Sequence, residues 1–431
     1  MNLSKEERAR IIKLVKQQVV PAIGCTEPIC VALSAARAAE VLAERPERVE
    51  VFLSANILKN AMGVGIPGTG MVGLPIAVAL GVLAGKSEYQ LEVLKDITAA
   101  DVEAGKRYIA ERRIKIALKE NIDEKLYAEV RVTGTGGHEA TAVIAGKHTH
   151  FVYVACDGKV LVDERVPVAG ESEGEDCVLN LRKVYDFSME APLEEIEFIR
   201  EARTLNEAAS AQALKGCYGH ELGKTLSRPL GRGIMGDNIF SHILSATSCA
   251  CDARMAGAMI PVMSNSGSGN QGICATMPVV VFAEENHNTD EELIRALMLS
   301  HLTAIYIKQS LGVLSALCGC VVASTGSSCG ITYLMGGNYE QVSYAVKNMI
   351  ANLTGMICDG AKPSCALKLT SGVSTAVLSA MLAMQQKCVS SVEGIIDDDV
   401  DQSIHNLTSI GAEAMNETDR KVLEIMTHKT S

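Results

Sequence analysis

The spacing of apolar residues along this 431-residue chain changes twice. Residues 5–19 and 27–43 carry apolar side chains at helical intervals and predict two helices, which the segment VVPAIGCTEPIC interrupts. Polar and apolar residues then alternate in residues 48–54 and 126–165, which predicts a strand followed by an antiparallel meander. From about residue 190 the helical interval returns and continues almost to the end of the chain.

Glycine-containing connections join these predicted elements. Gly146-Lys147 and Asp157-Gly158 indicate hairpin turns within the meander, and a glycine-dense stretch at residues 60–73 precedes a helical segment near residues 97–120. The C-terminal half is expected to contain long helices near residues 192–215, 238–258, 291–315, 339–355 and 365–387.

The length and the change of pattern predict more than one domain. A single core seldom grows beyond ~250–300 residues, so two domains are expected. We predict an α+β fold with a helical segment at residues 1–45 that packs on a mainly helical domain at residues 176–431. Residues 46–175 are expected to form a smaller α/β subdomain with an antiparallel sheet, and the acidic segment GESEGEDC (170–177) is the best candidate for the boundary.

The charge of the chain narrows the classes of partner. The formal net charge is -11 and no dense run of lysine and arginine reverses it, which speaks against binding to nucleic acid or to an anionic membrane. The longest apolar run, residues 70–85, contains Pro75 and is too short to span a membrane. We therefore expect a small-molecule partner or a second copy of the chain, as in a homodimer.

Cysteine usage indicates a reducing compartment. The chain has 14 cysteines, and its N-terminal segment is charged and amphipathic, unlike a signal peptide. We therefore expect a cytoplasmic protein with reduced thiols rather than a disulfide framework. Most of these thiols are expected to be inert core residues. We predict this role for Cys30, Cys156, Cys177, Cys217, Cys249, Cys251 and Cys388.

Four other cysteines lie at predicted breaks between helices. Neither the pair Cys318 and Cys320 nor the six-residue gap between Cys358 and Cys365 has the spacing of a structural zinc site, and the short-gap ferredoxin pattern is absent as well. Cys25 and Cys365 lie at predicted helix N-termini, where backbone N–H groups and the helix dipole stabilise a thiolate. A thiolate is the form that binds iron or removes a proton.

The segment SNSGSGNQG (264–272) is the best candidate for a substrate loop. It combines hydroxyl and amide side chains with flexible backbone, which suits binding of an α-carboxylate by Ser266, Ser268, Asn270 and Gln271; the alternative is a connecting turn. The segments GIPGTG and GTGGHEA lack the features of a phosphate loop or dinucleotide fingerprint. Weaker candidates for lining the pocket are Asn56, Asn60 and His138, although a lone histidine such as His138 more often has a structural role. Packing or surface roles are expected for His220, His242 and His301.

Four motifs in register carry a resemblance to a known family. PAIGCTEP, SGSGNQG, LSALCGC and MICDGAKPSCALK, spread over nearly the full length, resemble the L-cysteine desulfidases and the related serine dehydratase alpha-chain-like proteins. The iron-sulfur L-serine dehydratases are more distant relatives. The resemblance implies an oxygen-sensitive 4Fe-4S cluster and no requirement for pyridoxal phosphate.

The motifs place the family's functional residues on this sequence. They imply that Cys318, Cys358 and Cys365 hold the cluster and that Cys25 is the catalytic base. Cys320 stays open as an alternative first ligand because it is two residues from Cys318. Cys25 as a fourth ligand, rather than the base, also stays open.

Three cluster ligands suit a lyase. Four thiolates would close a cubane for electron transfer, whereas three leave one iron free to act as a Lewis acid on a substrate thiol or hydroxyl. We therefore expect β-elimination from L-cysteine to give pyruvate, ammonia and sulfide, with removal of the α-proton by a base of pKa near ambient pH. The alternatives are an L-serine dehydratase with the same mechanism and a non-catalytic iron-sulfur sensor.

Overall fold

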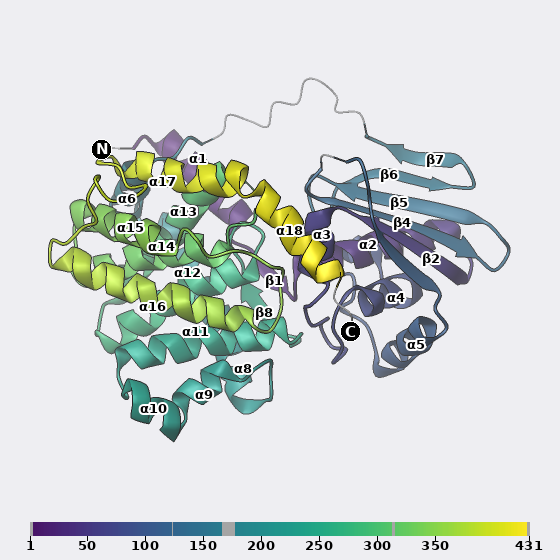
Figure 1. The fold of residues 1–431 in the computed structure, drawn as a ribbon, viewed down its shortest axis with the longest axis horizontal. Helices are drawn as coiled ribbons and strands as arrows, with labels where there is room; N and C mark the ends of the chain where they lie inside the picture. Colours follow the sequence, from purple (N-terminus) through teal and green to yellow (C-terminus); the bar gives the residue numbers. More distant parts are fainter. Residues whose placement is uncertain (1–2, 123, 166–176, 313–314, 429–431) are drawn as a thin grey trace.

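The chain folds into a helical lobe and a sheet lobe that lie side by side (Figure 1). The computed structural model describes residues 3–122, 124–165, 177–312 and 315–428. Each lobe has its own buried hydrophobic cluster, and the combination of many helices with one mainly antiparallel sheet confirms the predicted α+β class. The acidic segment expected at the domain boundary lies, apart from Cys177, outside the described residues.

The sheet lobe contains a six-stranded sheet in the order β3-β2-β4-β5-β6-β7. Helix α2 packs on β4 and β5, α4 packs on α2, and α5 packs on α4, so that helices stack in layers on one face of the sheet. The elements of this lobe are α2 (Thr26–Leu42), β2 (Pro46–Leu53), α3 (Ala55–Ala61), α4 (Leu74–Ala84), η1 (Ser87–Glu92), α5 (Ala99–Ala110), β3 (Ile114–Leu118), β4 (Tyr127–Gly134), β5 (Glu139–Ala145), β6 (Phe151–Cys156) and β7 (Lys159–Asp163).

The predicted meander is confirmed, with two corrections. Strands β4 to β7 pair antiparallel in sequence order, and Asp157 and Gly158 both have positive φ, as a tight hairpin turn requires. The β5–β6 connection is longer than a two-residue turn, because five residues separate Ala145 from Phe151. The helix expected near residues 97–120 ends at Ala110, and Ile114–Leu118 instead pairs parallel with β2 at the sheet edge. A short alternating run next to a helix is read as a strand only once its partner is known.

The helical lobe is organised around α14, whose residues are almost all buried. Its small side chains let α12, α13, α15 and α16 approach closely, as expected for a core with few aromatic residues. The elements of this lobe are α1 (Lys5–Gln18), α6 (Leu181–Glu190), α7 (Leu193–Ile196), η2 (Glu197–Arg200), α8 (Glu201–Lys215), α9 (Leu222–Ser227), α10 (Pro229–Met235), α11 (Ile239–Met255), α12 (Gly269–Glu285), α13 (Asp290–Leu311), α14 (Gly319–Leu334), α15 (Tyr339–Leu353), α16 (Cys365–Met384), α17 (Val400–Ser409), η3 (Ile410–Ala414) and α18 (Asn416–Thr427).

The first 45 residues are divided between the two lobes. Residues between Leu3 and Cys25 contribute to the core of the helical lobe, whereas α2 is part of the core of the sheet lobe. Between them, strand β1 (Pro21–Ile23) pairs antiparallel with β8 (Pro261–Met263) of the helical lobe. This two-stranded ribbon was not predicted, and it places Cys25 beside the residues that follow β8.

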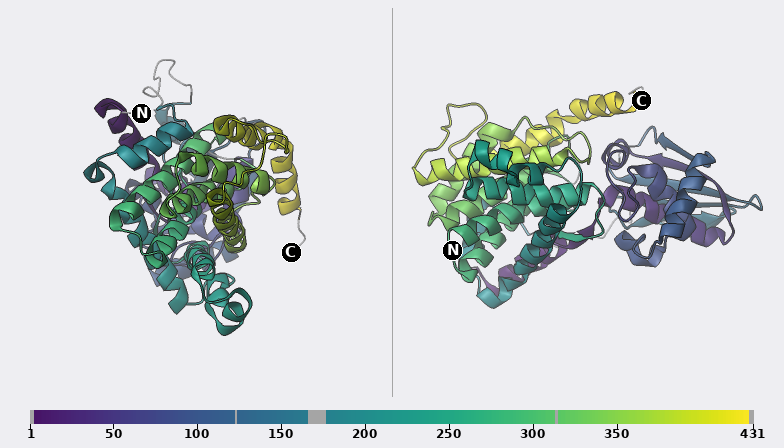
Figure 2. Two further views of the ribbon diagram at one scale, coloured as in Figure 1. Left: turned by 90° about the vertical axis from the view of Figure 1, so that its left-hand side faces the viewer. Right: turned by 90° about the horizontal axis from the view of Figure 1, so that it is seen from below.

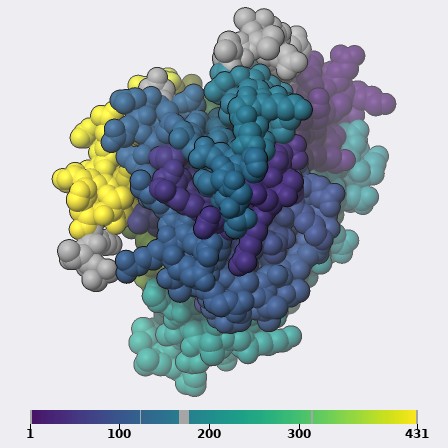
Figure 3. Space-filling model, turned by 90° about the vertical axis from the view of Figure 1, so that its right-hand side faces the viewer, coloured from purple at the N-terminus to yellow at the C-terminus, as the bar shows by residue number. Residues whose placement is uncertain are grey.

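The C-terminal helix also joins the lobes. Figure 2 shows α18 leaving the helical lobe toward the sheet lobe, and Figure 3 shows it, in yellow, at the side of that lobe. Helix α18 packs on α3, where Asp419 forms an ion pair with the buried Lys59.

One helix of the described residues, α16, is long and apolar enough to cross a membrane by length and composition alone. In its most apolar window, 56% of the residues are buried inside the protein, as in core helices that pass the same test.

Candidate active site

Cys318 and Cys358 are held next to each other by paired backbone. The amide N–H of Cys318 donates to the carbonyl oxygen of Met356 at 2.9 Å, and that of Cys358 donates to the carbonyl of Ala316 at 2.6 Å. These bonds flank an antiparallel bridge between Leu317 and Ile357. Two cysteines that are 40 positions apart in the sequence are thereby aligned on adjacent segments.

Cys365, the first residue of α16, completes a group of three half-buried thiols. Burial raises the pKa of Cys358 and of Cys365, and the charge of Cys318 raises both further, so the three thiols are within electrostatic range of one another. Nearby lysines oppose this rise without cancelling it: Lys59 and Lys368 lower the pKa of Cys358, and Lys362 lowers that of Cys365.

Cys318 and Cys320 have different environments. The sulfur atoms of Cys318 and Cys320 are 3.4 Å apart, and the hydrogen bonding with Cys320, with the nearby Lys368, lowers the pKa of Cys318 to about 7. Cys320 is 4% exposed, contacts the sulfur of Met356 at 3.1 Å, and has a pKa well above its usual value. Cys318 is therefore the better thiolate donor of the two.

Cys25 lies at the N-cap of α2, at the helix N-terminus that the sequence predicts. Its thiol donates to Oε2 of Glu27 at 2.8 Å. Burial and the Glu27 carboxylate raise the pKa of Cys25 well above its usual value, with the nearby Arg254 opposing them. The expected pKa near ambient pH is therefore wrong for this state of the protein, because the helix dipole is outweighed by burial and a neighbouring negative charge.

Glu27 is an ionised carboxylate at the centre of a buried network. Burial opposes its ionisation, but the nearby His148 and the bond from Cys25 outweigh burial, so its pKa lies below the usual value. Besides Cys25, it accepts from Thr26 at 3.1 Å and, through Oε1, from Nδ2 of Asn60 at 3.1 Å.

Helix α3 connects this network to the three thiols. Lys59, next to Asn60, donates to the carbonyl oxygen of Cys358 at 3.4 Å. Gly360 has φ +88°, and a Cβ there would lie 2.3 Å from the carbonyl oxygen of Lys59, so only glycine lets this turn approach α3. Lys308 of α13 is also within electrostatic range of Cys318, Cys358 and Glu27. The thiols and the Cys25–Glu27 pair therefore form one site where the lobes meet.

The predicted substrate loop lies beside this site, and its four candidate side chains have different hydrogen-bond partners. Ser268 caps α12 by accepting from the N–H of Gln271, and the Ser266 hydroxyl donates to Asn265 at 2.9 Å. Asn270 accepts from Nη1 of Arg254 at 2.9 Å. The side chain of Gln271 lies against Gly319, the residue that follows Cys318.

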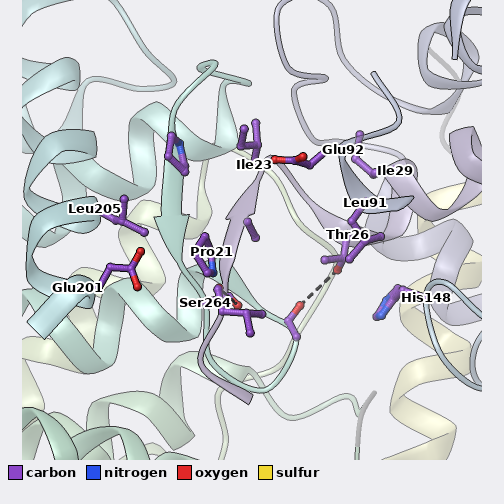
Figure 4. A pocket seen from close by; sticks show the side chains of 14 residues that line it. Pro21, Ile23, Thr26, Ile29, Leu91, Glu92, His148, Glu201, Leu205 and Ser264 are labelled. Carbon is purple, nitrogen blue, oxygen red and sulfur yellow. Dashed lines mark hydrogen bonds between the residues drawn. The ribbon is translucent and has the colours of Figure 1, made fainter. Parts of the chain in front are cut away.

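Two cavities lie beside these residues. The smaller, about 420 Å³, is mostly apolar and lies where β1 and β8 pass the start of α2; Figure 4 shows Thr26 bonded to the Gly267 carbonyl at its wall. The larger, about 1030 Å³, lies between α1, α13 and the β5–β6 connection, and Lys308 lines it. His148 lines both cavities, and burial lowers the pKa of Lys308 to about 8.

Comparison with known proteins identifies the family. A family model described as serine dehydratase alpha chain matches residues 88–424. The chain belongs to the serine dehydratase alpha chain family. It is 71% identical over 425 residues, or 99% of both chains, to a "UPF0597 protein" of Bacteroides thetaiotaomicron. Proteins of the same name from Porphyromonas gingivalis and Shewanella halifaxensis are 55% and 46% identical, each over 97% of this chain and 98% of their own length.

The serine dehydratase alpha chain family is associated with iron-sulfur serine dehydratases, and cysteine thiols are the ligand type that such clusters use. Among the described residues, no group of three His, Cys, Asp or Glu side chains is arranged to hold one metal ion. Cysteine thiolates are the ligands of iron-sulfur clusters, and Cys318, Cys358 and Cys365 are within electrostatic range of one another. Lys59, Lys362 and Lys368 supply positive charge next to these thiols.

Sequence reasoning missed several charged residues of this serine dehydratase-like site. Glu27, Lys59, Arg254 and Lys308 are each no more than 9% exposed, although they occur in predicted apolar helices or breaks. These residues could have been found in the sequence as charged residues within predicted apolar helices, because an ionised side chain is seldom buried without a role.

The other candidates fall outside the thiol group. Asn56 donates to Asp419 at 2.9 Å, and His138 bonds Asp157 at 2.6 Å near a hairpin end. His242 is paired at the surface, and His301 is buried against Asn265 and Thr276, which confirms surface and packing roles for these two.

Proposed function

We propose that the chain is a pyridoxal-independent lyase that converts L-cysteine and water to pyruvate, ammonia and sulfide. Membership of the serine dehydratase alpha chain family supports a lyase. The observation that carries the proposal is that Cys318, Cys358 and Cys365 are within electrostatic range of one another, and that Lys59 and Asn60 of helix α3 link Cys358 to the Glu27 carboxylate, to which the thiol of Cys25 is bonded.

Cys318, Cys358 and Cys365 would hold a 4Fe-4S cluster. Cys318 is favoured over Cys320 because it is the more exposed of the two and has the lower pKa. When bound with three ligands, the cluster supplies an iron that can act as a Lewis acid on the leaving sulfur.

Cys25 would remove the α-proton of the substrate, with Glu27 as its partner. In the structure the thiol proton already points to the Glu27 carboxylate. Transfer of this proton to Glu27 would leave a thiolate on Cys25, which can then take the proton from the α-carbon as the carbon–sulfur bond breaks. The aminoacrylate product adds water and releases ammonia to give pyruvate.

The loop that carries Ser266, Ser268, Asn270 and Gln271 would bind the substrate beside this base. Its position after β8 supports this role, because β8 pairs with the strand that precedes Cys25. Gln271 is the best placed of the four, since its Oε1 has no partner among the described residues, whereas the hydroxyls of Ser266 and Ser268 have partners in the loop and Asn270 is bonded to Arg254.

L-serine is the second candidate substrate, and the family description favours it. Serine and cysteine differ in one atom of the leaving group, and both can be activated by an open iron. We propose cysteine as the natural substrate on the motif resemblance, and a cytoplasmic enzyme on its 14 free thiols.

The test is anaerobic purification with measurement of iron and sulfide content, followed by assays for pyruvate from L-cysteine, D-cysteine and L-serine and for sulfide from the two cysteines. We expect air-purified protein to be colourless and inactive with unchanged circular dichroism, and anaerobic reconstitution to restore brown colour and activity together. Full turnover in a metal-free preparation would overturn the cluster proposal. Higher kcat/KM for L-serine would establish the second candidate.

A further inference from the structure

The buried polar atoms near Cys25 and the thiols that have no hydrogen-bond partner among the described residues include one each from helices α3, α11 and α12. These three are Nε of Arg254, Oδ1 of Asn60 and Oε1 of Gln271. Unpartnered buried polar atoms are rare, and each one calls for a cause such as a missing ligand. Here they occur at one site and differ in kind, since one is a cationic donor and two are neutral acceptors.

Arg254 is a buried cation that lacks an anion. Its side chain is in the last turn of α11, 3% exposed, and among the described residues its guanidinium forms no ion pair. It is close enough to lower the pKa of both Cys25 and Glu27, but the Glu27 oxygens are bonded to Cys25, Thr26 and Asn60. A buried guanidinium is stabilised by a carboxylate whose two oxygens accept hydrogen bonds from two of its N–H groups.

Asn60 and Gln271 present acceptors without donors. Because the ionised Glu27 can only accept, Asn60 must turn Nδ2 toward it, which leaves Oδ1 available. Gln271 lies across Gly319, where a Cβ would come within 2.9 Å of its Cδ, and its Oε1 is buried without a partner among the described residues. An ammonium group has three donors and no acceptor, so it complements two such oxygens.

We propose that these three residues recognise both charged ends of a free α-amino acid: Arg254 binds the α-carboxylate, and Asn60 and Gln271 accept hydrogen bonds from the α-ammonium. The inference rests on the proposed function for this site. It reassigns the loop, because Asn270 becomes a positioning residue that holds Nη1 of Arg254 rather than a direct carboxylate ligand. With both ends held, Cα is fixed and one enantiomer presents its α-proton to Cys25.

The test uses three probes that cannot undergo elimination. L-alanine has both charged ends, propionate has only the carboxylate and ethylamine only the amine, and their dissociation constants for anaerobically loaded protein can be measured by ligand-observed NMR. Arg254→Gln should weaken L-alanine and propionate by about 10- to 100-fold, the range for a charge-assisted pair, and leave ethylamine unchanged. Gln271→Met should weaken L-alanine and ethylamine but not propionate.

Controls separate recognition from folding. Arg254→Lys keeps the charge without the fork and should weaken propionate by less than Arg254→Gln does, while Arg232→Gln, at an exposed arginine of α10, should change nothing. Every variant is compared by melting temperature and iron content. Unchanged propionate binding in Arg254→Gln, or equal weakening of both fragments in either variant, overturns the inference.

Failure of the inference is distinguishable from failure of the proposed function. Suppose that loaded wild-type protein binds L-alanine, and that Arg254→Gln weakens propionate while Gln271→Met weakens ethylamine. If the wild-type protein then makes no pyruvate from L-cysteine or L-serine, the lyase proposal fails and the recognition site stands. If wild-type protein does not bind L-alanine, the recognition site is overturned, whatever the turnover.

Discussion

The thiol of Cys25 donates a hydrogen bond to the carboxylate of Glu27, with 2.8 Å between Sγ and Oε2. Both side chains are buried at the start of α2, where the N-cap position of Cys25 points its side chain at the junction of the lobes. In this pair the proton is on Cys25, and it must move to Glu27 before Cys25 can act as a thiolate base. It also explains why the resting thiol has a raised pKa even though it is at a helix N-terminus.

The first prediction separates this pair from the cluster ligands. Cys25→Ala and Glu27→Gln should each lower kcat by about 10²- to 10⁴-fold, because they remove the base or its proton acceptor, and should keep wild-type iron content. Cys30→Ala, at a buried cysteine of the same helix, is the matched control and should stay active. If Cys25→Ala loses its iron, Cys25 is a fourth ligand that the substrate must displace.

The second prediction concerns the ligands themselves. Alanine at Cys318, Cys358 or Cys365 should lower bound iron and brown absorbance along with activity, because each ligand contributes to holding the cluster. Cys320→Ala should retain both iron and turnover. If Cys320→Ala loses iron and Cys318→Ala keeps it, Cys320 rather than Cys318 is the ligand.

The third prediction tests the loop. Asn270→Ala should raise KM at least about tenfold with the cluster spectrum unchanged, because Arg254 loses the amide that positions its guanidinium. Asn286→Ala, at the exposed C-terminal end of the same helix, should leave KM as in wild type. An unchanged KM in Asn270→Ala would show that the loop is only a connector.

The fourth prediction concerns the contact of α18 with α3. Lys59 is 1% exposed and is paired with Asp419, so Asp419→Ala leaves a buried ammonium unpaired and should destabilise the protein by about 3 kcal/mol. Lys59→Met added to Asp419→Ala should recover much of that loss. In the same helix, Glu424→Ala breaks only the exposed pair with Lys421 and should cost under about 1 kcal/mol, as thermal unfolding can measure.

The fifth prediction is a pH dependence at Asp252. Its Oδ2 accepts from the N–H of Gly223 at 3.1 Å, its Oδ1 has no partner among the described residues, and burial raises its pKa to about 6. The folded state therefore binds the proton more tightly than the unfolded state, and stability falls as pH rises from about 4 to 6.

Asp252→Asn removes this effect. The variant should melt about 1 to 3 °C higher than wild type at pH 7.5, and the difference should vanish below about pH 4, where the carboxyl is protonated in both states. Asp398→Asn, at an exposed position, is the control. A pH-independent difference between Asp252→Asn and wild type would show that burial of the charge is not the cause.

The sequence predicted the elements whose signals are local. The long helices of the C-terminal half and the meander of β4 to β7 follow from apolar periodicity, which depends on one face of each element being buried. The edge strand Ile114–Leu118 was missed because its identity depends on pairing with β2, a partner distant in sequence. The β1–β8 ribbon was missed for the same reason, since three-residue strands have almost no pattern of their own.

The sequence by itself determined the α+β class, the main helices, and the cysteine motifs that resemble an iron-sulfur lyase family. Only the tertiary structure decided that Cys318 and Cys358 are aligned on adjacent segments, and that Glu27, Asn60 and Arg254 gather near Cys25. The physical reason is that periodicity and motifs are properties of neighbouring residues. The pKa of Cys25 and the unpartnered atoms of Arg254 and Asn60 arise instead from burial and charge contributed by separate segments, which exist together only once the two lobes meet.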